Sequence, residues 1–334
     1  MGWHERSWAF VTGRLVAGQL PHALLIGGEQ GVGKRYFADR LAHSLVCENA
    51  SAPDYQPCGR CKQCELVAAD THPDIRVYAP EKSRMIKVDQ VRALSAFAVA
   101  SPQVAQRKLI VIDRADQLNI NAANALLKTL EEPSADVVLL LLQETGRPVL
   151  PTLRSRCQAL TIATPAPDTA ASWLSSQLAR QGSAIEAGED RCRQALEMAR
   201  YAPRLALDYL SGDYLAQRQE ALSMFRRFMK SELAVGEAAK PFKTLGAEAT
   251  LWLMELWAAD LARLAVGGSG RDSDAADMLG FLARVNPPWR AHQLLDSIRE
   301  SRAALVYNAS PELEAERLLL EWQALMPRKQ RRAG

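Results

Sequence analysis

A glycine-rich run ahead of an amphipathic segment is the first group of residues whose types and spacing could do chemistry. Residues Gly28-Glu-Gln-Gly-Val-Gly-Lys-Arg35 fit the first seven positions of the signature G-x-x-x-x-G-K-[ST]. Such a loop holds phosphates with backbone N–H groups at a helix N-terminus and with its lysine side chain. The candidate phosphate-binding residues are therefore Gly28, Gly31, Gly33 and Lys34.

Two positions of this candidate nucleotide site carry side chains that do not suit ATP hydrolysis. The signature should end in Ser or Thr, whose hydroxyl holds Mg²⁺, but this chain has Arg35. The second candidate Mg²⁺ ligand is Asp113, which follows the apolar run 109–112 and precedes Arg114, where many ATPases have a general base. Asp116 is expected to face a loop. These residues leave nucleotide binding undecided and disfavour hydrolysis.

Four cysteines form the second group, with the spacing C-x₁₀-C-x₂-C-x₂-C. They are Cys47, Cys58, Cys61 and Cys64. Four thiolates close together fit a tetrahedral zinc site that leaves no position for a catalytic water, so the predicted cofactor is one structural Zn²⁺. The alternative is four free thiols. Cys157 and Cys192 lack such neighbours and are interpreted as small apolar residues, and His72 is expected to be structural.

An alternation of strands and helices has to position these residues. Short, mostly apolar runs predict strands at 22–27, 109–112, 137–142 and 159–162, and 74–78 also reads as a short strand. Helical spacing or a terminating proline predicts helices at 34–46, 87–99 and 121–131. Because the strands are apolar throughout, the expected fold class is α/β, with a parallel sheet covered on both faces. Beyond residue 164 only helices are expected.

Length and composition bound the remaining possibilities. A chain of 334 residues suits two or three domains, and a net charge of +3 does not suit a bulk nucleic-acid coat. The prolines within 164–168 predict a linker, giving domains at 1–163 with a zinc module at about 47–70, at 164–210 and at 211–334. With no signal peptide and no membrane-spanning run predicted, a cytoplasmic location is expected.

Several blocks of the sequence together resemble a known family. They are His22–Ile26, the cysteine insertion, Thr71–Asp74, Asn124–Pro133 and Leu153–Cys157. The chain resembles the delta-prime subunits of the bacterial DNA polymerase III clamp loader, which belong to the AAA+ family. The ATP-hydrolysing gamma/tau subunits share the last two blocks, and the substitutions Arg35 and Arg114 favour delta-prime. The resemblance covers about the first 210 residues firmly.

The resemblance implies a three-part chain and a set of partners. It implies a RecA-like AAA+ base domain with a zinc insertion, a small helical lid and an all-α collar. It also implies a ring of five subunits, with gamma/tau and delta, that loads the sliding clamp onto primed DNA. Arg156 in the Ser-Arg-Cys triplet matches the family's arginine finger, which acts in trans on a neighbour's nucleotide. No ATP turnover of its own is expected, and Arg204 and Glu144 fall at positions of nucleotide sensors.

Two alternatives remain beside this hypothesis. A motor of the gamma/tau type would use Lys34 and Asp113 to hydrolyse ATP. A zinc-dependent DNA-binding module would use basic side chains near the cysteines, such as Arg60 and Lys62. Acidic residues are interspersed there, so this hypothesis ranks last of the three. Because Arg35 and Arg114 oppose the motor, a subunit without turnover is the preferred interpretation.

Overall fold

The computed structural model describes residues 1–81, 85–180, 188–306 and 309–327. The chain folds into two compact units. The first contains residues 1–173 together with the short segment 202–205, and the second contains residues 174–201 and the chain from Ala206 onward. The division at residues 163 and 210 that was expected from the sequence stays a prediction.

A five-stranded parallel sheet forms the centre of the first unit. Its strands are β1 (Ala23–Gly28), β2 (Ile75–Tyr78), β3 (Lys108–Ile112), β4 (Val137–Glu144) and β5 (Gln158–Thr161), and their order is β2-β3-β4-β1-β5. In the register, Ile26 lies beside Leu142 on one side and Leu160 on the other. All five strands were predicted from the sequence, so the parallel α/β fold class is confirmed.

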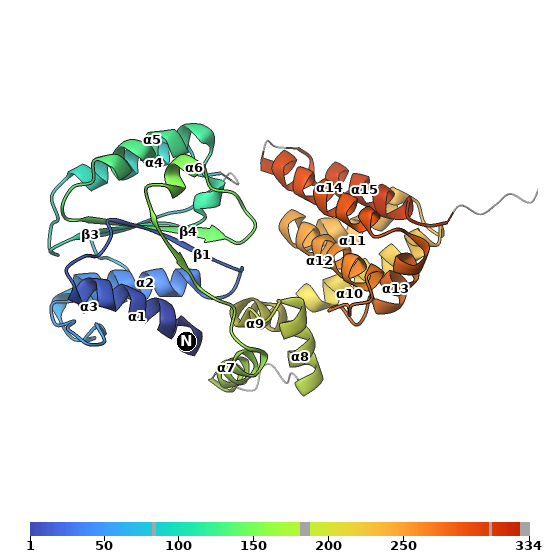
Figure 1. Ribbon diagram of the computed structural model, residues 1–334, viewed down its shortest axis with the longest axis horizontal. Coiled ribbons are helices and arrows are strands. Elements are labelled where there is room, and N and C mark those ends of the chain that lie inside the picture. Colours follow the sequence, from blue (N-terminus) through green and yellow to red (C-terminus); the bar gives the residue numbers. More distant parts are fainter. Residues whose placement is uncertain (82–84, 181–187, 307–308, 328–334) are drawn as a thin grey trace, which may run out of the picture. The chain divides into compact units, whose positions relative to one another are not determined.

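Helices cover both faces of this sheet. They are α1 (Glu5–Val16), α2 (Lys34–Val46), α3 (Lys62–Ala68), α4 (Val88–Val99), α5 (Ile120–Glu131) and α6 (Pro151–Arg154), with short 3-10 turns at Gly2–His4 and Ala115–Gln117. In Figure 1, α1, α2 and α3 lie on one face and α4, α5 and α6 on the other. This double cover explains why β3 is buried along its whole length.

Helix α5 shows how the sequence fixes its own boundaries. The Asn119 side chain caps the helix by accepting a hydrogen bond of 2.8 Å from the backbone N–H of Ala122. The apolar residues Ala123, Leu126 and Leu130 recur at helical spacing and are buried toward the sheet. Pro133 lies two residues beyond the last helical residue. It has no backbone N–H to continue the hydrogen bonds, so the helix stops before it.

The second unit is helical throughout its described residues, as the sequence predicted. Its helices are the end of α7 (Pro167–Arg180), α8 (Glu189–Met198), most of α9 (Pro203–Ser211), α10 (Tyr214–Met229), α11 (Val235–Leu245), α12 (Ala247–Ala265), α13 (Ala276–Val285), α14 (Trp289–Val306) and α15 (Pro311–Gln323). The core is aromatic. Phe225 stacks on Trp257 with ring centroids 5.0 Å apart, and Phe242 and Trp322 meet them edge-on.

A buried ion cluster joins α10 to the loop before α13. The guanidinium of Arg218 is only 1% exposed and bonds the carboxylates of Asp272 and Asp274. Trp257 donates a further hydrogen bond of 2.8 Å to Asp272. A buried charge is stable only when it is paired, so this loop is held firmly against α10.

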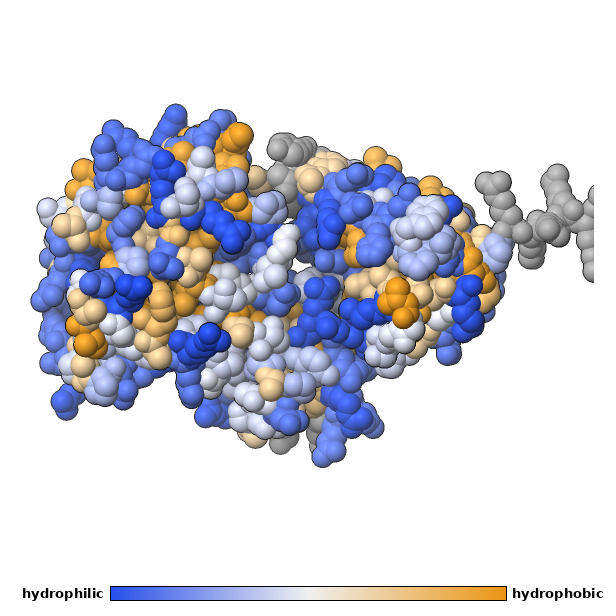
Figure 2. Space-filling view, viewed as in Figure 1, coloured by the Kyte–Doolittle hydropathy of each residue, from blue (hydrophilic) through white to orange (hydrophobic). Residues whose placement is uncertain are grey.

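The surface of the first unit and that of the second are both mixed in polarity. Figure 2 shows hydrophilic side chains over much of the visible face, with apolar residues scattered between them. Among the described residues, no helix combines the length and the apolar composition that crossing a membrane requires.

Candidate nucleotide site and metal centre

The phosphate loop lies between β1 and α2, where the signature predicted it. Gly31 and Gly33 have φ values of 79° and 92°, which side chains rarely adopt, so the glycines of the motif are needed for the turn. The Lys34 ammonium donates hydrogen bonds of 2.8 Å to the carbonyl oxygens of Gly28 and Glu29. Burial lowers the pKa of Lys34. The amine that would reach phosphates is therefore bonded to its own loop.

The N-terminal turn of the chain covers this loop. Trp3 Nε1 and His4 Nε2 each lie 2.9 Å from the carbonyl oxygen of Val32. A Cβ atom on Gly33 would come within 2.8 Å of Met1 Sδ. Sequence reasoning missed this cover. Its only signal was the aromatic character of a short N-terminal segment that carries Trp3 and His4.

The start of α9 contacts the same loop from within the first unit. The backbone N–H of Arg204 donates a hydrogen bond of 3.1 Å to the carbonyl oxygen of Gly31. A Cβ atom on Gly31 would lie 2.4 Å from the Cβ of Leu205, so no other residue fits there. The Arg204 side chain is exposed. Its contact with the loop is therefore made by its backbone.

Arg35 occupies the side of the site where a metal ion would be expected. Its guanidinium lies 3.2 Å from Asp113 and 2.7 Å from Asp39. The Asp113 carboxylate is thus paired with a cation from the same chain. Of the two substitutions recognised in the sequence, Arg35 and Arg114, the first therefore also neutralises the acid that would hold Mg²⁺.

Arg114 belongs to a second group of paired charges beside Asp113. It lies 3.4 Å from Glu144, and Arg147 lies 2.7 Å from the other oxygen of Glu144. Beneath them the Asp116 carboxylate is completely buried and accepts a hydrogen bond of 3.2 Å from the Glu144 backbone. Burial and the neighbouring charge of Glu144 raise the pKa of Asp116.

This arrangement corrects one expectation. Asp116 was expected to face a loop, and that prediction is wrong. The 3-10 turn that follows Arg114, whose φ is 72°, directs the Asp116 side chain inward toward the end of β4. Arg147 was not recognised from the sequence, because only the fold brings it to the acids at the end of β4.

The four cysteines come together at the other end of α2. Cys47 ends α2, Cys58 lies in the following loop, and Cys61 and Cys64 begin α3. Their sulfurs all lie within 4.8 Å of one another, with separations of 3.5, 3.9 and 3.9 Å for three of the pairs. Zn–S bonds of about 2.3 Å in a tetrahedron place sulfurs about 3.8 Å apart. The donor set therefore fits zinc.

The surroundings of the sulfurs also favour a metal-binding state. The Cys58 backbone N–H lies 3.3 Å from the Cys47 sulfur, and Asn49 donates to the Cys58 sulfur at 3.5 Å. A hydrogen bond from the Arg60 backbone is the main cause that lowers the pKa of Cys58 to about 6. Burial in contrast raises the pKa of Cys64, so it is at Cys58 that these donors favour the thiolate, the metal-binding form of cysteine.

His72 does not join the cysteines. One ring nitrogen lies 2.8 Å from Gln63 Oε1, and the other accepts a hydrogen bond of 3.1 Å from the Asp74 backbone. The Asp74 carboxylate accepts three backbone hydrogen bonds from residues 103–105, and these lower its pKa although burial alone would raise it. Both residues hold the start of β2, the structural role expected for His72.

Arg156 lies just beyond α6, in the connection from β4 to β5. Its guanidinium lies 2.5 Å from Glu131 at the end of α5 and donates a hydrogen bond of 2.9 Å to the carbonyl oxygen of Thr152. The side chain is 35% exposed. The structure thus brings Lys34, Arg35 and Asp113 to one site and the cysteines to another, while Arg156 contacts the end of α5 and α6.

Comparison with known proteins places the chain in one family. A sequence model described as DNA polymerase III, delta subunit, matches residues 3–166. The DNA polymerase III subunit delta' of Pseudomonas aeruginosa is 31% identical over 332 residues, which cover 97% of each chain. The subunit delta' of Haemophilus influenzae is 34% identical over 209 residues, covering 63% of this chain and 61% of that protein.

The gamma/tau subunits share a shorter region. The DNA polymerase III subunit gamma/tau of Mycobacterium tuberculosis strain H37Rv is 34% identical over 142 residues, covering 42% of this chain and 24% of that protein. The likeness to the subunit delta' of Pseudomonas aeruginosa, in contrast, extends over nearly the whole of both chains. The chain therefore belongs to the delta-prime subunit family of DNA polymerase III.

Proposed function

We propose that this chain is a clamp-loader subunit that does not turn over ATP and that supplies Arg156 to a neighbouring ATPase subunit. The observation that carries the proposal is the pairing of Arg35 with Asp113 at 3.2 Å. A hydrolytic site needs that carboxylate for Mg²⁺, and here a guanidinium stands beside it. Family membership supports the role of the whole chain in the loader.

The remaining groups of the site support the absence of turnover. Arg114 stands at the position of the general base and is paired with Glu144, so it cannot activate water. Lys34 is bonded to carbonyl oxygens of its own loop. The N-terminal turn at Trp3 and His4 covers the loop as well. Each part that would act on ATP has a partner within the chain.

The surroundings of Arg156 support a trans role. The guanidinium is partly exposed, and its two contacts with Glu131 and Thr152 hold it at the end of α5 without burying it. A planar guanidinium can grip phosphate oxygens with two N–H groups and can neutralise charge that develops on a transferring phosphoryl group. Arginine fingers of this kind contribute on the order of 10³–10⁵ in rate at the site they complete.

The proposal includes the setting of the protein. The partners are gamma/tau and delta subunits in a five-subunit ring, with the sliding clamp and primed DNA reached through that complex in the cytoplasm. Residues 1–163, 164–210 and 211–334 act as base, lid and collar. One structural Zn²⁺ is held by the four-cysteine cluster, whose sulfurs lie within 4.8 Å of one another.

The test is the clamp- and DNA-stimulated ATPase activity of a reconstituted loader. Arg156→Ala should abolish turnover at the one site that it completes, so total activity should fall by that site's share and clamp loading should fall further. Arg156→Lys should rescue poorly, because an ammonium lacks the planar fork. Arg154→Ala is the matched control, since Arg154 is exposed and only two residues away.

A second control separates the two kinds of subunit. Lys34→Ala should leave the ATPase activity of the loader unchanged if this chain does not hydrolyse ATP. A loss of activity in Lys34→Ala with none in Arg156→Ala would favour a motor of the gamma/tau type. Unchanged ATPase and clamp loading in Arg156→Ala would overturn the trans role.

A further inference from the structure

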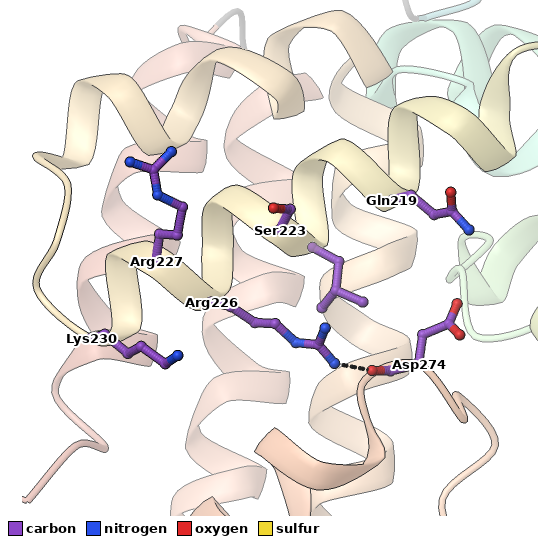
Figure 3. A pocket seen from close by; sticks show the side chains of 7 residues that line it. Gln219, Ser223, Arg226, Arg227, Lys230 and Asp274 are labelled. Carbon is purple, nitrogen blue, oxygen red and sulfur yellow. Dashed lines mark hydrogen bonds between the residues drawn. The ribbon is translucent and has the colours of Figure 1, made fainter.

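A hollow of about 470 Å³ lies along α10 in the second unit, beside the ion cluster of Arg218. Its lining consists of Gln219, Leu222, Ser223, Arg226, Arg227, Lys230 and Asp274. Six of these residues recur every three or four positions along α10, so they form one stripe on the helix. Figure 3 shows the Arg226 and Lys230 side chains extending to the same side of α10.

The single acid of the hollow is bonded from behind, by an arginine that it shares with Asp272. The Asp274 carboxylate accepts hydrogen bonds of 2.7 Å from the buried Arg218 and 2.6 Å from Gln194. Arg226 bonds the backbone carbonyl oxygen of Asp274, not its carboxylate (Figure 3). Among the described residues, Arg226 thus forms no direct ion pair with this carboxylate, and its guanidinium is held in place.

The other cations add to this charge. Lys230 is exposed, and within the described part of the chain no carboxylate forms an ion pair with it. Arg227 lies 3.6 Å from Glu232, and both of these side chains are half-exposed, so solvent weakens that pair. Within the described residues, the lining of the hollow thus carries a net positive charge.

The helix C-terminus accounts for only part of this pattern. Cations near the last carbonyl groups of a helix are favourable, which explains Lys230 just beyond Met229. It does not explain why Gln219 and Ser223 continue the same stripe, about three and nearly two turns before the helix ends. Each of these polar side chains has an N–H or O–H donor, and a row of such donors along one helix suits oxyanions.

We infer that this hollow binds the sugar–phosphate backbone of a DNA strand. Arg, Lys, Ser and Gln side chains are the residue types that contact phosphate oxygens in DNA complexes. The stripe from Gln219 to Lys230 rises about 16 Å along the helix, which is more than one phosphate group needs and suits several consecutive nucleotides. An acidic peptide fits less well, because the lining offers a single apolar residue, Leu222, as an anchor.

The experiment measures binding of the full chain to a fluorescent single-stranded oligothymidylate across a salt series. Lys230→Gln should weaken binding several-fold, and Arg226→Gln/Lys230→Gln at least 10-fold. For single strands, log K falls by about 0.7 per neutralised phosphate for each unit of log salt, so the double variant should lower the slope by about 1.4. Thermal unfolding checks that both variants are folded.

Two control variants isolate the hollow from charge in general and from the proposed trans role. Lys240→Gln/Lys243→Gln removes two exposed cations of α11 and should change the affinity much less. Arg156→Ala should leave it unchanged, so failure of this inference is distinct from failure of the proposed function. The inference is overturned if the wild type does not bind the strand at low salt, or if the α11 variant weakens binding as much as Arg226→Gln/Lys230→Gln. Tighter, Lys230-dependent binding of polyglutamate would instead assign the hollow to an acidic protein partner.

Discussion

The phosphate loop and the cysteine cluster lie at opposite ends of α2, and they treat charge in opposite ways. At the phosphate loop, the charged groups that would hold Mg²⁺ and ATP are paired inside the chain, as Arg35 is with Asp113. At the cysteine cluster, four groups of the same kind face one another within 4.8 Å. A site that contains its own counter-charge does not depend on a ligand, whereas a cluster of thiolates requires a cation.

The most direct test of this comparison removes the proposed zinc from the cysteine cluster. Structural zinc supplies about 10–16 kcal/mol of apparent binding free energy in small zinc-dependent peptides, and the apolar cluster of this insertion consists of the cysteines with Ala50 packed beside them. Cys61→Ser or a strong chelator should therefore unfold this insertion while leaving the sheet folded. Hydrogen exchange measured by mass spectrometry should show lost protection in residues 47–68.

A matched variant controls for the loss of a thiol. Cys192→Ser changes a cysteine outside the cluster and should not alter protection of the insertion. Elemental analysis should find one zinc per wild-type chain and much less in Cys61→Ser. Protein purified without chelators that contains no zinc, yet keeps the insertion protected, would contradict the comparison.

A smaller effect is expected from acid at the phosphate loop. Burial lowers the pKa of His4 from 6.5 to about 4, and Nδ1 has no hydrogen-bond partner in the described part of the chain. Between these two pH values His4 is largely protonated in the unfolded chain and largely neutral in the folded one. The contribution of neutral His4 to the free energy of unfolding is therefore complete above pH 6.5 and is lost as the pH drops toward 4. The loss attributable to His4 is at most about 3 kcal/mol.

The expected consequence is local opening of the N-terminal turn. His43 and His72 also have lowered pKa values owing to burial, so the effect of His4 must be taken as a difference between proteins. His4→Gln keeps a donor for Val32 and does not titrate, and its stability should depend less on pH between 4 and 6.5. Hydrogen exchange of residues 34–37 reports the opening. Equal pH dependence in the variant and the wild type would show that the turn does not close the loop.

The sequence predicted the elements well because their signals are local. The strands at 109–112 and 137–142 are uninterrupted apolar runs, and the cysteine spacing already indicated that four thiols would lie together. The internal pairing of the nucleotide site was not predictable in the same way. Arg35 and Asp113 are 78 residues apart, and only the neighbouring positions of β1, β4 and β3 bring α2 and the end of β3 together.

The errors have the same cause. Asp116 was placed in a loop because it lies two residues beyond Arg114, but its environment is set by Glu144 and Arg147 from another strand end. The cover formed by Trp3 and His4 depends on how α1 packs against α2 and β5, which the spacing of residues along the chain does not show. Local patterns therefore identified the parts of the site, while tertiary contacts decided which charges meet.

The smallest expected effect is that of replacing Arg35, which tests whether the internal ion pair of the phosphate loop matters by itself. Arg35→Thr restores the hydroxyl of the phosphate-loop signature and removes the guanidinium from Asp113. The Arg35 side chain is 43% exposed, and exposed ion pairs contribute at most about 1 kcal/mol, so the free energy of unfolding should change by no more than that. ATP turnover should stay at background, because Arg114 still occupies the base position and Lys34 remains bonded to its loop. Denaturant unfolding and a turnover assay measure both quantities. Turnover in Arg35→Thr that disappears when Lys34→Ala is added would show that one guanidinium alone suppresses the site, and that the other internal pairs are not needed to do so.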